Sequence, residues 1–155
     1  MFKLRDSYTL DAPAERIWPL IFDPSSLMSL IPGCEGLEEA GPNEYRGTLR
    51  IGIAAVAGRY DTHVSVVDRD EPTFCRMKGE VSGPTGAISG EATFELQPDA
   101  EQTVLIYTGK ALITGALGRL SPRFLEGVAG ALIRQGLGKL NRRLQAEPAP
   151  ENHED

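Results

Sequence analysis

The sequence has few of the residues on which several large classes of protein depend. Among its 155 residues are two cysteines and two histidines, and 16 basic residues stand against 22 acidic ones. Two cysteines are too few for a disulfide framework, and a net charge of −6 is opposite in sign to that of nucleic-acid-binding domains. No run approaches the roughly 18 apolar residues of a membrane span. We therefore expect a cytoplasmic protein with reduced cysteines and no nucleic-acid partner.

Length and charge distribution predict one domain followed by a short tail. A chain of 155 residues falls in the range of roughly 100 to 200 residues for a single domain. The end of the chain holds a cluster of acids, namely Glu147, Glu151, Glu154 and Asp155. We expect a single ligand-binding domain over residues 1–146 and a disordered acidic tail over residues 147–155. The sequence leaves the oligomeric state open.

Hydrophobic periodicity predicts an α+β fold. Apolar and polar residues alternate over residues 2–10, which indicates a strand, and Asp6 is the one charged member of its apolar face. Asp-Ala-Pro at residues 11–13 and Asp-Pro at residues 23–24 predict two short helices, the first capped by Asp11 or Ala12 and the second by Asp23. Pro19 should kink or shorten the first of these. Segments with a period of two predict six more strands, near residues 35–40, 44–54, 58–69, 73–82, 86–97 and 102–114.

A long amphipathic helix follows, beginning at Ser121-Pro122 and ending before Pro148. Strands joined by short turns predict an antiparallel meander. A sheet with one apolar face must bury that face, and this helix is the only element long enough to cover it. We therefore predict a helix-grip fold, in which a curved, antiparallel, seven-stranded sheet wraps around a long C-terminal helix, with two short helices after the first strand.

The inward-facing strand positions mix large apolar residues with very small ones, such as Gly47, Gly79, Gly90 and Gly109. The terminal helix also contains glycines, each costing roughly 1 kcal/mol relative to alanine: Gly127, Gly130, Gly136 and Gly138. One interpretation is that the glycines let the sheet bend and the helix approach it closely. The other is that they leave an apolar cavity between sheet and helix. We favour the cavity, because compact cores usually fill such volume.

Residues for catalysis or metal binding are scarce. Strand parity points His63 outward, and no second histidine or cysteine has the spacing of a metal ligand. No nucleophile motif or inward acid–base pair is present. We therefore predict no enzymatic activity, no metal and no resident cofactor. Three inward tyrosines, Tyr45, Tyr60 and Tyr107, could each offer a hydroxyl to a ligand carbonyl or be satisfied within the core.

The terminal segment is rich in basic residues. Against Glu126 alone stand Arg119, Arg123, Arg134, Lys139, Arg142 and Arg143. One interpretation is a solvated outer face; the other is a surface that rests on an anionic membrane or an acidic partner.

Several segments resemble those of a known family. APAERIW at residues 12–18, followed by Asp-Pro at residues 23–24, is similar to the START-like helix-grip (SRPBCC) superfamily. Within that superfamily the chain resembles the CoxG family, the G subunits of carbon monoxide dehydrogenase, in IPGCEGLE at residues 31–38, in the strands around Gly79 and Gly90, and in GALG at residues 115–118.

The resemblance implies a non-catalytic accessory protein of a molybdenum hydroxylase of the carbon monoxide dehydrogenase type. Such a protein would carry a hydrophobic molecule, such as a respiratory quinone or a lipid-like ligand, and link the enzyme to the inner face of the cell membrane. The competing hypotheses are an assembly or recruitment factor without a stable ligand and, less favoured, an enzyme on the same fold.

Access for a ligand is expected between the terminal helix and residues 30–33 and 115–118. Strand and helix parity predict the following cavity residues: Trp18, Phe22, Leu30, Ile31, Leu49, Ile51, Tyr60, Val64, Met77, Gly79, Ile88, Gly90, Phe94, Tyr107, Gly109, Phe124, Gly127, Val128, Ala131 and Leu132.

Overall fold

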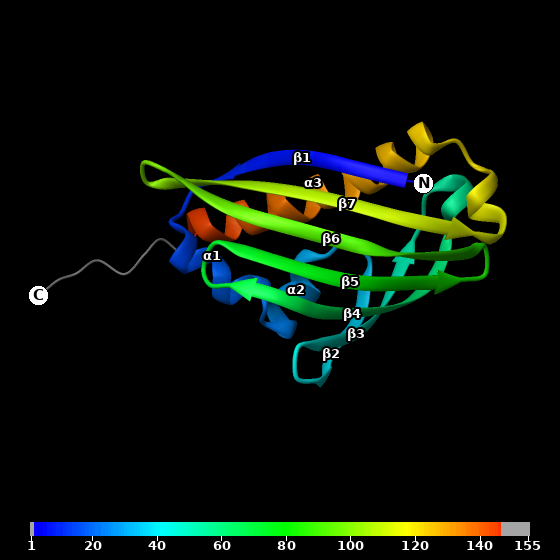
Figure 1. The fold of residues 1–155 in the computed structure, drawn as a ribbon, viewed down its shortest axis with the longest axis horizontal. Coiled ribbons are helices and arrows are strands. Elements are labelled where there is room, and N and C mark those ends of the chain that lie inside the picture. The colour runs from blue at the N-terminus through cyan, green and yellow to red at the C-terminus, as the bar shows by residue number, and fades with distance from the viewer. Residues whose placement is uncertain (1, 147–155) are drawn as a thin grey trace, which may run out of the picture.

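A computed structural model describes residues 2–146 of the chain (Figure 1). Its elements in chain order are β1 (Phe2–Leu10), α1 (Ala14–Ile21), α2 (Pro24–Leu30), β2 (Cys34–Gly41), β3 (Glu44–Ile51), η1 (Ala54–Val56), β4 (Gly58–Asp70), β5 (Phe74–Gly83), β6 (Gly86–Asp99), β7 (Gln102–Thr114), η2 (Gly115–Arg119) and α3 (Pro122–Ala146). The tail predicted over residues 147–155 lies outside the described residues.

The predicted fold class is confirmed. All seven strands form one antiparallel sheet in the order β1-β7-β6-β5-β4-β3-β2, so β2 to β7 form a meander and β1 pairs with the last strand. The sheet curves around α3, which crosses its concave side (Figure 1). Strand parity was also predicted correctly for much of the sheet, because Leu49 of β3, Val64 of β4 and Met77 of β5 all face α3.

The two short helices begin in different ways. Asp23 caps α2 as predicted, because its carboxylate accepts hydrogen bonds from the backbone N–H of Ser26 at 3.1 Å and from the Ser26 hydroxyl at 2.7 Å. The prediction that Asp11 or Ala12 caps α1 is wrong, since Pro13 occupies the cap position without a side-chain hydrogen bond. The helix contains Pro19 and ends at Ile21, consistent with the predicted shortening.

Asp11 instead fastens the end of β1 to α3. Its carboxylate accepts hydrogen bonds from Gln145 at 2.6 Å, from Gln102 and from Asn141, while its own N–H donates to the Asn141 side chain at 2.8 Å. The hydrogen bond from Gln145, followed by those from Gln102 and Asn141, lowers the pKa of Asp11. These contacts hold the C-terminal end of α3 against β1 and β7.

Asp6, the charged residue on the inward face of β1, is explained by a partner on α3. Its carboxylate accepts a hydrogen bond from the Arg134 guanidinium at 2.7 Å. The backbone N–H of Ser7 and then Arg134 lower the pKa of Asp6. The pair lies at the edge of the sheet, where both side chains stay partly exposed, so it aligns α3 with β1 without burying a charge.

The apolar core has two parts at opposite ends of α3. The larger cluster surrounds Trp18 and includes Leu140 and Leu144 of the helix, whereas the smaller one surrounds Tyr60 and includes Leu125. Between Leu125 and Leu140 no apolar residue of α3 is fully buried. The middle of the helix therefore lies over the sheet without the close packing found at its two ends.

Candidate functional site

A cavity of about 470 Å³ lies between the sheet and α3. This volume is within the range of small-molecule sites. Its walls come from both short helices, from β2 to β7 and from α3. They are formed by Leu20, Ile21, Phe22, Leu27, Leu30, Ile31, Pro32, Cys34, Leu37, Tyr45, Gly47, Leu49, Ile51, Thr62, Val64, Val66, Met77, Ala92, Thr93, Phe94, Leu105, Tyr107, Thr108, Leu132, Ile133, Gly136, Leu137 and Leu140.

The structure brings half of the sequence-predicted site residues together on these walls. They are Phe22, Leu30, Ile31, Leu49, Ile51, Val64, Met77, Phe94, Tyr107 and Leu132. The other half lie elsewhere, namely Trp18, Tyr60, Gly79, Ile88, Gly90, Gly109, Phe124, Gly127, Val128 and Ala131. Three structural features account for the positions of most of these residues.

The first feature is that some of these residues are buried within the core. Trp18 is 4% exposed and lies behind the cavity wall, with its ring 4.8 Å from that of Phe22 and 5.9 Å from that of Phe94. Tyr60, Ile88 and Val128 belong to the smaller apolar cluster beyond the cavity. For Tyr60 and Ile88, alternation along the strand identified the inward face correctly but does not show how far along the sheet the cavity extends.

The second feature is that neighbouring backbone occupies the space over an inward glycine. A Cβ built on Gly90 would lie 2.2 Å from the carbonyl oxygen of Lys110 and 2.8 Å from the Cβ of Ala111. Gly79 and Gly109 are not crowded in this way, because Cβ atoms there would lie 3.5 Å and 3.8 Å from the nearest atoms of neighbouring strands. Gly90 thus permits close approach of the neighbouring strand, as the first interpretation of the glycines requires.

The third feature is that part of α3 faces outward. Gly127 and Ala131 are exposed, Phe124 is 38% exposed, and a Cβ on Gly127 would meet nothing within 4 Å. Only Gly136 among the helix glycines lines the cavity. A Cβ there would lie 3.4 Å from the carbonyl oxygen of Leu30, so this glycine lets α3 approach the segment after α2.

That approach changes the expected access to the cavity. Residues Leu30, Ile31 and Pro32 do line it, but α3 packs against them at Gly136. Residues 115–118 do not reach the cavity, and Leu117 is 2% exposed within the smaller cluster. The predicted access beside residues 115–118 is therefore wrong.

The predicted set of cavity residues left out several wall residues that the sequence pattern places on the inward faces. Tyr45, Thr62, Val66 and Ala92 occupy the same inward parity as the residues that were named. Ile133 and Leu137 continue the apolar face of α3. Wall residues of the short helices, such as Leu27, could not be predicted from the sequence, because they depend on how α2 packs over the sheet.

Two hydroxyl groups in the cavity wall have no hydrogen-bond partner among the described residues. They are the Tyr107 hydroxyl and the Thr62 Oγ1, and both oxygen atoms are buried. The other two candidate tyrosines are satisfied: Tyr45 donates to the carbonyl of Phe22 at 3.2 Å and Tyr60 to that of Val56 at 2.7 Å. A buried polar group without a partner costs roughly 1 to 3 kcal/mol, so both hydroxyls would gain from a polar atom of a bound molecule.

The remaining chemistry of the cavity is neutral. Among the described residues that line it there is no carboxylate, histidine, lysine or arginine. Burial, and then the nearby Asp6 carboxylate, raise the pKa of Tyr107. Burial also raises the pKa of the Cys34 thiol, which keeps it protonated and a poor nucleophile. The cavity can therefore hold an apolar molecule and donate one or two hydrogen bonds to it.

Other candidate features lie outside the cavity. His63 is on the outer face of β4, with its Nε2 atom 3.1 Å from a carboxylate oxygen of Glu44. Over residues 2–146, no three His, Cys, Asp or Glu side chains come together in a way that could hold a metal ion. None of the helices in this range combines the length and the apolar character needed to cross a membrane.

Comparisons with known proteins identify the family. The family model for the carbon monoxide dehydrogenase G subunit (CoxG) matches residues 7–145. A comparison with curated protein sequences gave no significant match. A crystal structure of a conserved protein from Geobacillus kaustophilus is 34% identical with a TM-score of 0.88, over 92% of this chain and 94% of that one.

More distant structures share the fold alone. A START superfamily protein from Mycobacterium smegmatis is 15% identical with a TM-score of 0.72, over 96% of this chain and 100% of that one. The ZhuI aromatase/cyclase from Streptomyces sp. R1128 is 19% identical with a TM-score of 0.65, over 96% and 98% of the two chains. With the family match over residues 7–145, these likenesses show that the chain belongs to the CoxG family of carbon monoxide dehydrogenase G subunits and has the START-like fold.

Proposed function

We propose that this protein is a non-catalytic carrier of a hydrophobic small molecule, which it holds between the sheet and α3. The observation that carries the proposal is the apolar cavity of about 470 Å³ with two unpartnered hydroxyls in its wall. Burial of apolar surface would supply most of the binding free energy, at about 25 cal/mol per Å². The absence of acid–base side chains among its described lining residues supports binding rather than catalysis.

A respiratory quinone fits the chemistry of this cavity. Its isoprenoid tail is apolar. Its ring carbonyls can accept hydrogen bonds but carry no hydrogen to donate. The neutral hydroxyls of Tyr107 and Thr62 are donors. A lipid with an ester carbonyl presents the same acceptor, and comparison of the two ligand classes in one assay would separate them.

The family supports a partner as well as a ligand. Membership of the CoxG family favours an accessory role beside a carbon monoxide dehydrogenase-type molybdenum hydroxylase. We propose that the protein acts in the cytoplasm and exchanges its ligand with that enzyme.

The direct test is native mass spectrometry of the purified protein, with organic extraction of whatever remains bound. We expect a lipophilic molecule at one copy per chain, and a rise in melting temperature when menaquinone or ubiquinone analogues are added to the extracted protein. A chain that is empty as purified and shows no thermal shift with quinones or lipids would refute the carrier function.

A Tyr107→Phe variant should change folding stability and ligand affinity in opposite directions. Removing the unpartnered hydroxyl should raise the free energy of unfolding of the ligand-free protein by about 1 kcal/mol. Ligand binding should weaken about fivefold to tenfold, because one hydrogen bond of roughly 1 kcal/mol is lost. Chemical denaturation and ligand titration measure the two effects.

Tyr45→Phe is the matched control for stability. It removes the same atom from another cavity tyrosine, but there the hydroxyl donates to the carbonyl of Phe22. This variant should therefore lose about 1 kcal/mol of stability. If Tyr107→Phe is destabilised by a similar amount, its hydroxyl has a partner in the ligand-free protein and is not reserved for a ligand.

A further inference from the structure

Three loops meet at the end of the molecule farthest from α1. They are residues 52–58 between β3 and β4, residues 83–86 between β5 and β6, and residues 114–124 between β7 and the first turn of α3. The Tyr60 hydroxyl donates to the carbonyl of Val56 and lies 2.7 Å from the Thr85 Oγ1. The N–H of Leu117 donates to the Thr85 carbonyl at 2.9 Å. We call this surface the loop end.

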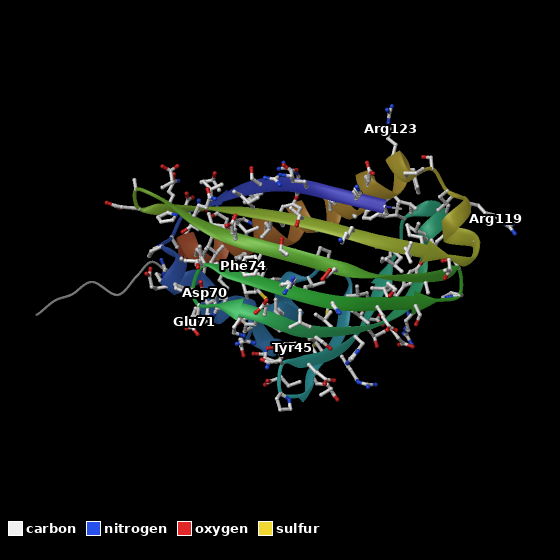
Figure 2. The ribbon with its side chains drawn as sticks, in the orientation of Figure 1. Tyr45, Asp70, Glu71, Phe74, Arg119 and Arg123 are labelled. Carbon is white, nitrogen blue, oxygen red and sulfur yellow. The ribbon has the colours of Figure 1, made fainter. Side chains whose placement is uncertain are left out.

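The loop end contains no aspartate or glutamate, although the chain as a whole is acidic. Its charged residues are Arg119 and Arg123, whose side chains are exposed and project from the body of the protein (Figure 2). Neither has an ion-pair partner within residues 2–146. Nearby, Arg50 and Arg59 share Glu35. The next acids are Glu126, one turn along α3, and Asp61 and Glu80, farther along β4 and β5.

The opposite end of the sheet has the reverse character. Its turns and the adjoining strand ends carry Asp70, Glu71, Asp99 and Glu101, with Arg69 among them, and Asp68, which pairs with Arg76 at 2.6 Å. Asp70 and Glu71 lie at the far side of the molecule from Arg119 and Arg123 (Figure 2). Along the sheet, the charge therefore changes sign from this end to the loop end, which favours approach of the loop end to a negative surface.

The loop end also exposes large apolar side chains. Ile53 is 36% exposed and Phe124, next to Arg123, is 38% exposed. Ile53 follows closely after Ile51, which belongs both to the cavity wall and to the smaller apolar cluster behind the loops. An apolar surface thus extends from the cavity to the exposed loops.

We propose that the loop end docks on an anionic lipid bilayer, with Phe124 and Ile53 inserted among the lipids and Arg119 and Arg123 against the phosphate groups. Exposed aromatic and aliphatic residues beside arginines, with no carboxylate among them, are the combination that such an interface attracts. Of the basic residues considered from the sequence, Arg119 and Arg123 belong to the loop end, whereas Arg134 pairs with Asp6 and Arg143 also has an interaction partner. The docking does not depend on the proposed ligand.

Vesicle sedimentation tests whether Arg119 and Arg123 attract the loop end to an anionic bilayer. The full chain should bind vesicles that contain one third phosphatidylglycerol in phosphatidylcholine, and should bind pure phosphatidylcholine much more weakly. Because each arginine contributes roughly fivefold to partitioning, R119A/R123A should bind about 30-fold less tightly. The control K78A/K110A removes the same charge from the outer face of β5 and β7, where both lysines are exposed, and should bind within about twofold of the unmodified protein.

Tryptophan quenching tests whether the loop end is the part of the protein that enters the bilayer. With brominated lipids, F124W should add a strongly quenched signal to that of Trp18, which is 4% exposed. M28W is the control, because Met28 is 42% exposed and α2, which carries it, lies away from the loop end (Figure 1). Absence of vesicle binding, equal losses in the two double variants, or equal quenching at residues 28 and 124 would each overturn the proposal. All of these measurements use ligand-free vesicles and protein, so the carrier function is tested separately.

Discussion

Replacing Ala92 with phenylalanine is expected to weaken binding of the lipophilic ligand about 100-fold while leaving the fold intact. Ala92 lies on β6 and lines the cavity, between Met77 of β5 and Gly109 of β7. A Cβ on Gly109 would be 4.0 Å from that of Ala92. The small side chain of Ala92 thus leaves space at this point of the cavity wall, and a phenyl ring at residue 92 would occupy that space.

The expected magnitude follows from packing. Forcing extra volume into a filled site costs typically 1 to 3 kcal/mol, and about 3 kcal/mol corresponds to roughly 100-fold in affinity. The ligand-free protein should not lose stability, because the new ring enters an empty apolar space and contacts its walls. Native mass spectrometry and ligand titration measure retention and affinity, and chemical denaturation measures the free energy of unfolding.

Ala131→Phe is the matched control for this experiment. It makes the same substitution on the exposed face of α3, away from the cavity wall. This variant should retain the ligand with unchanged affinity. Full retention by Ala92→Phe would mean that the ligand binds somewhere other than the cavity between sheet and helix.

Gly90→Ala should be among the most damaging of the single-methyl substitutions. The added Cβ would lie 2.2 Å from the carbonyl oxygen of Lys110, and because that atom belongs to the backbone, strand β7 must shift. We expect a loss of about 3 kcal/mol in the free energy of unfolding. For a protein of this size that corresponds to a fall of roughly 6 to 12 °C in melting temperature, measured by circular dichroism.

Two other glycines provide controls with different expected signs. Gly79→Ala, on the neighbouring strand, would place its Cβ 3.5 Å from the His63 carbonyl oxygen, an ordinary contact, and should cost much less than Gly90→Ala. Gly127→Ala should stabilise α3 by about 1 kcal/mol, since its Cβ would meet nothing within 4 Å. Equal effects at residues 79 and 90 would show that strand propensity, rather than the close approach of β7, determines the cost.

The fold was largely predictable from the sequence because its signals are local. A period of two along each strand, turn residues between strands and one long amphipathic helix leave few arrangements that bury both apolar faces. The cap at Asp23 and the start of α3 at Pro122 were read correctly for the same reason. Asp11 was misread because its partners Gln102, Asn141 and Gln145 are more than 90 residues away.

The candidate site was predictable only in part. The alternation that places Val64 and Met77 on the concave face acts between adjacent residues, so the chain alone determines which side chains face α3. Whether a small residue there leaves space depends on neighbouring strands and on the helix: the space over Ala92 is open, and the space over Gly90 is filled by β7. The sequence likewise supplied the three tyrosines, but only the tertiary structure decided that Tyr45 and Tyr60 have partners and that the Tyr107 hydroxyl has none among the described residues. Each of those hydrogen bonds joins a side chain to backbone that another element must first bring into place.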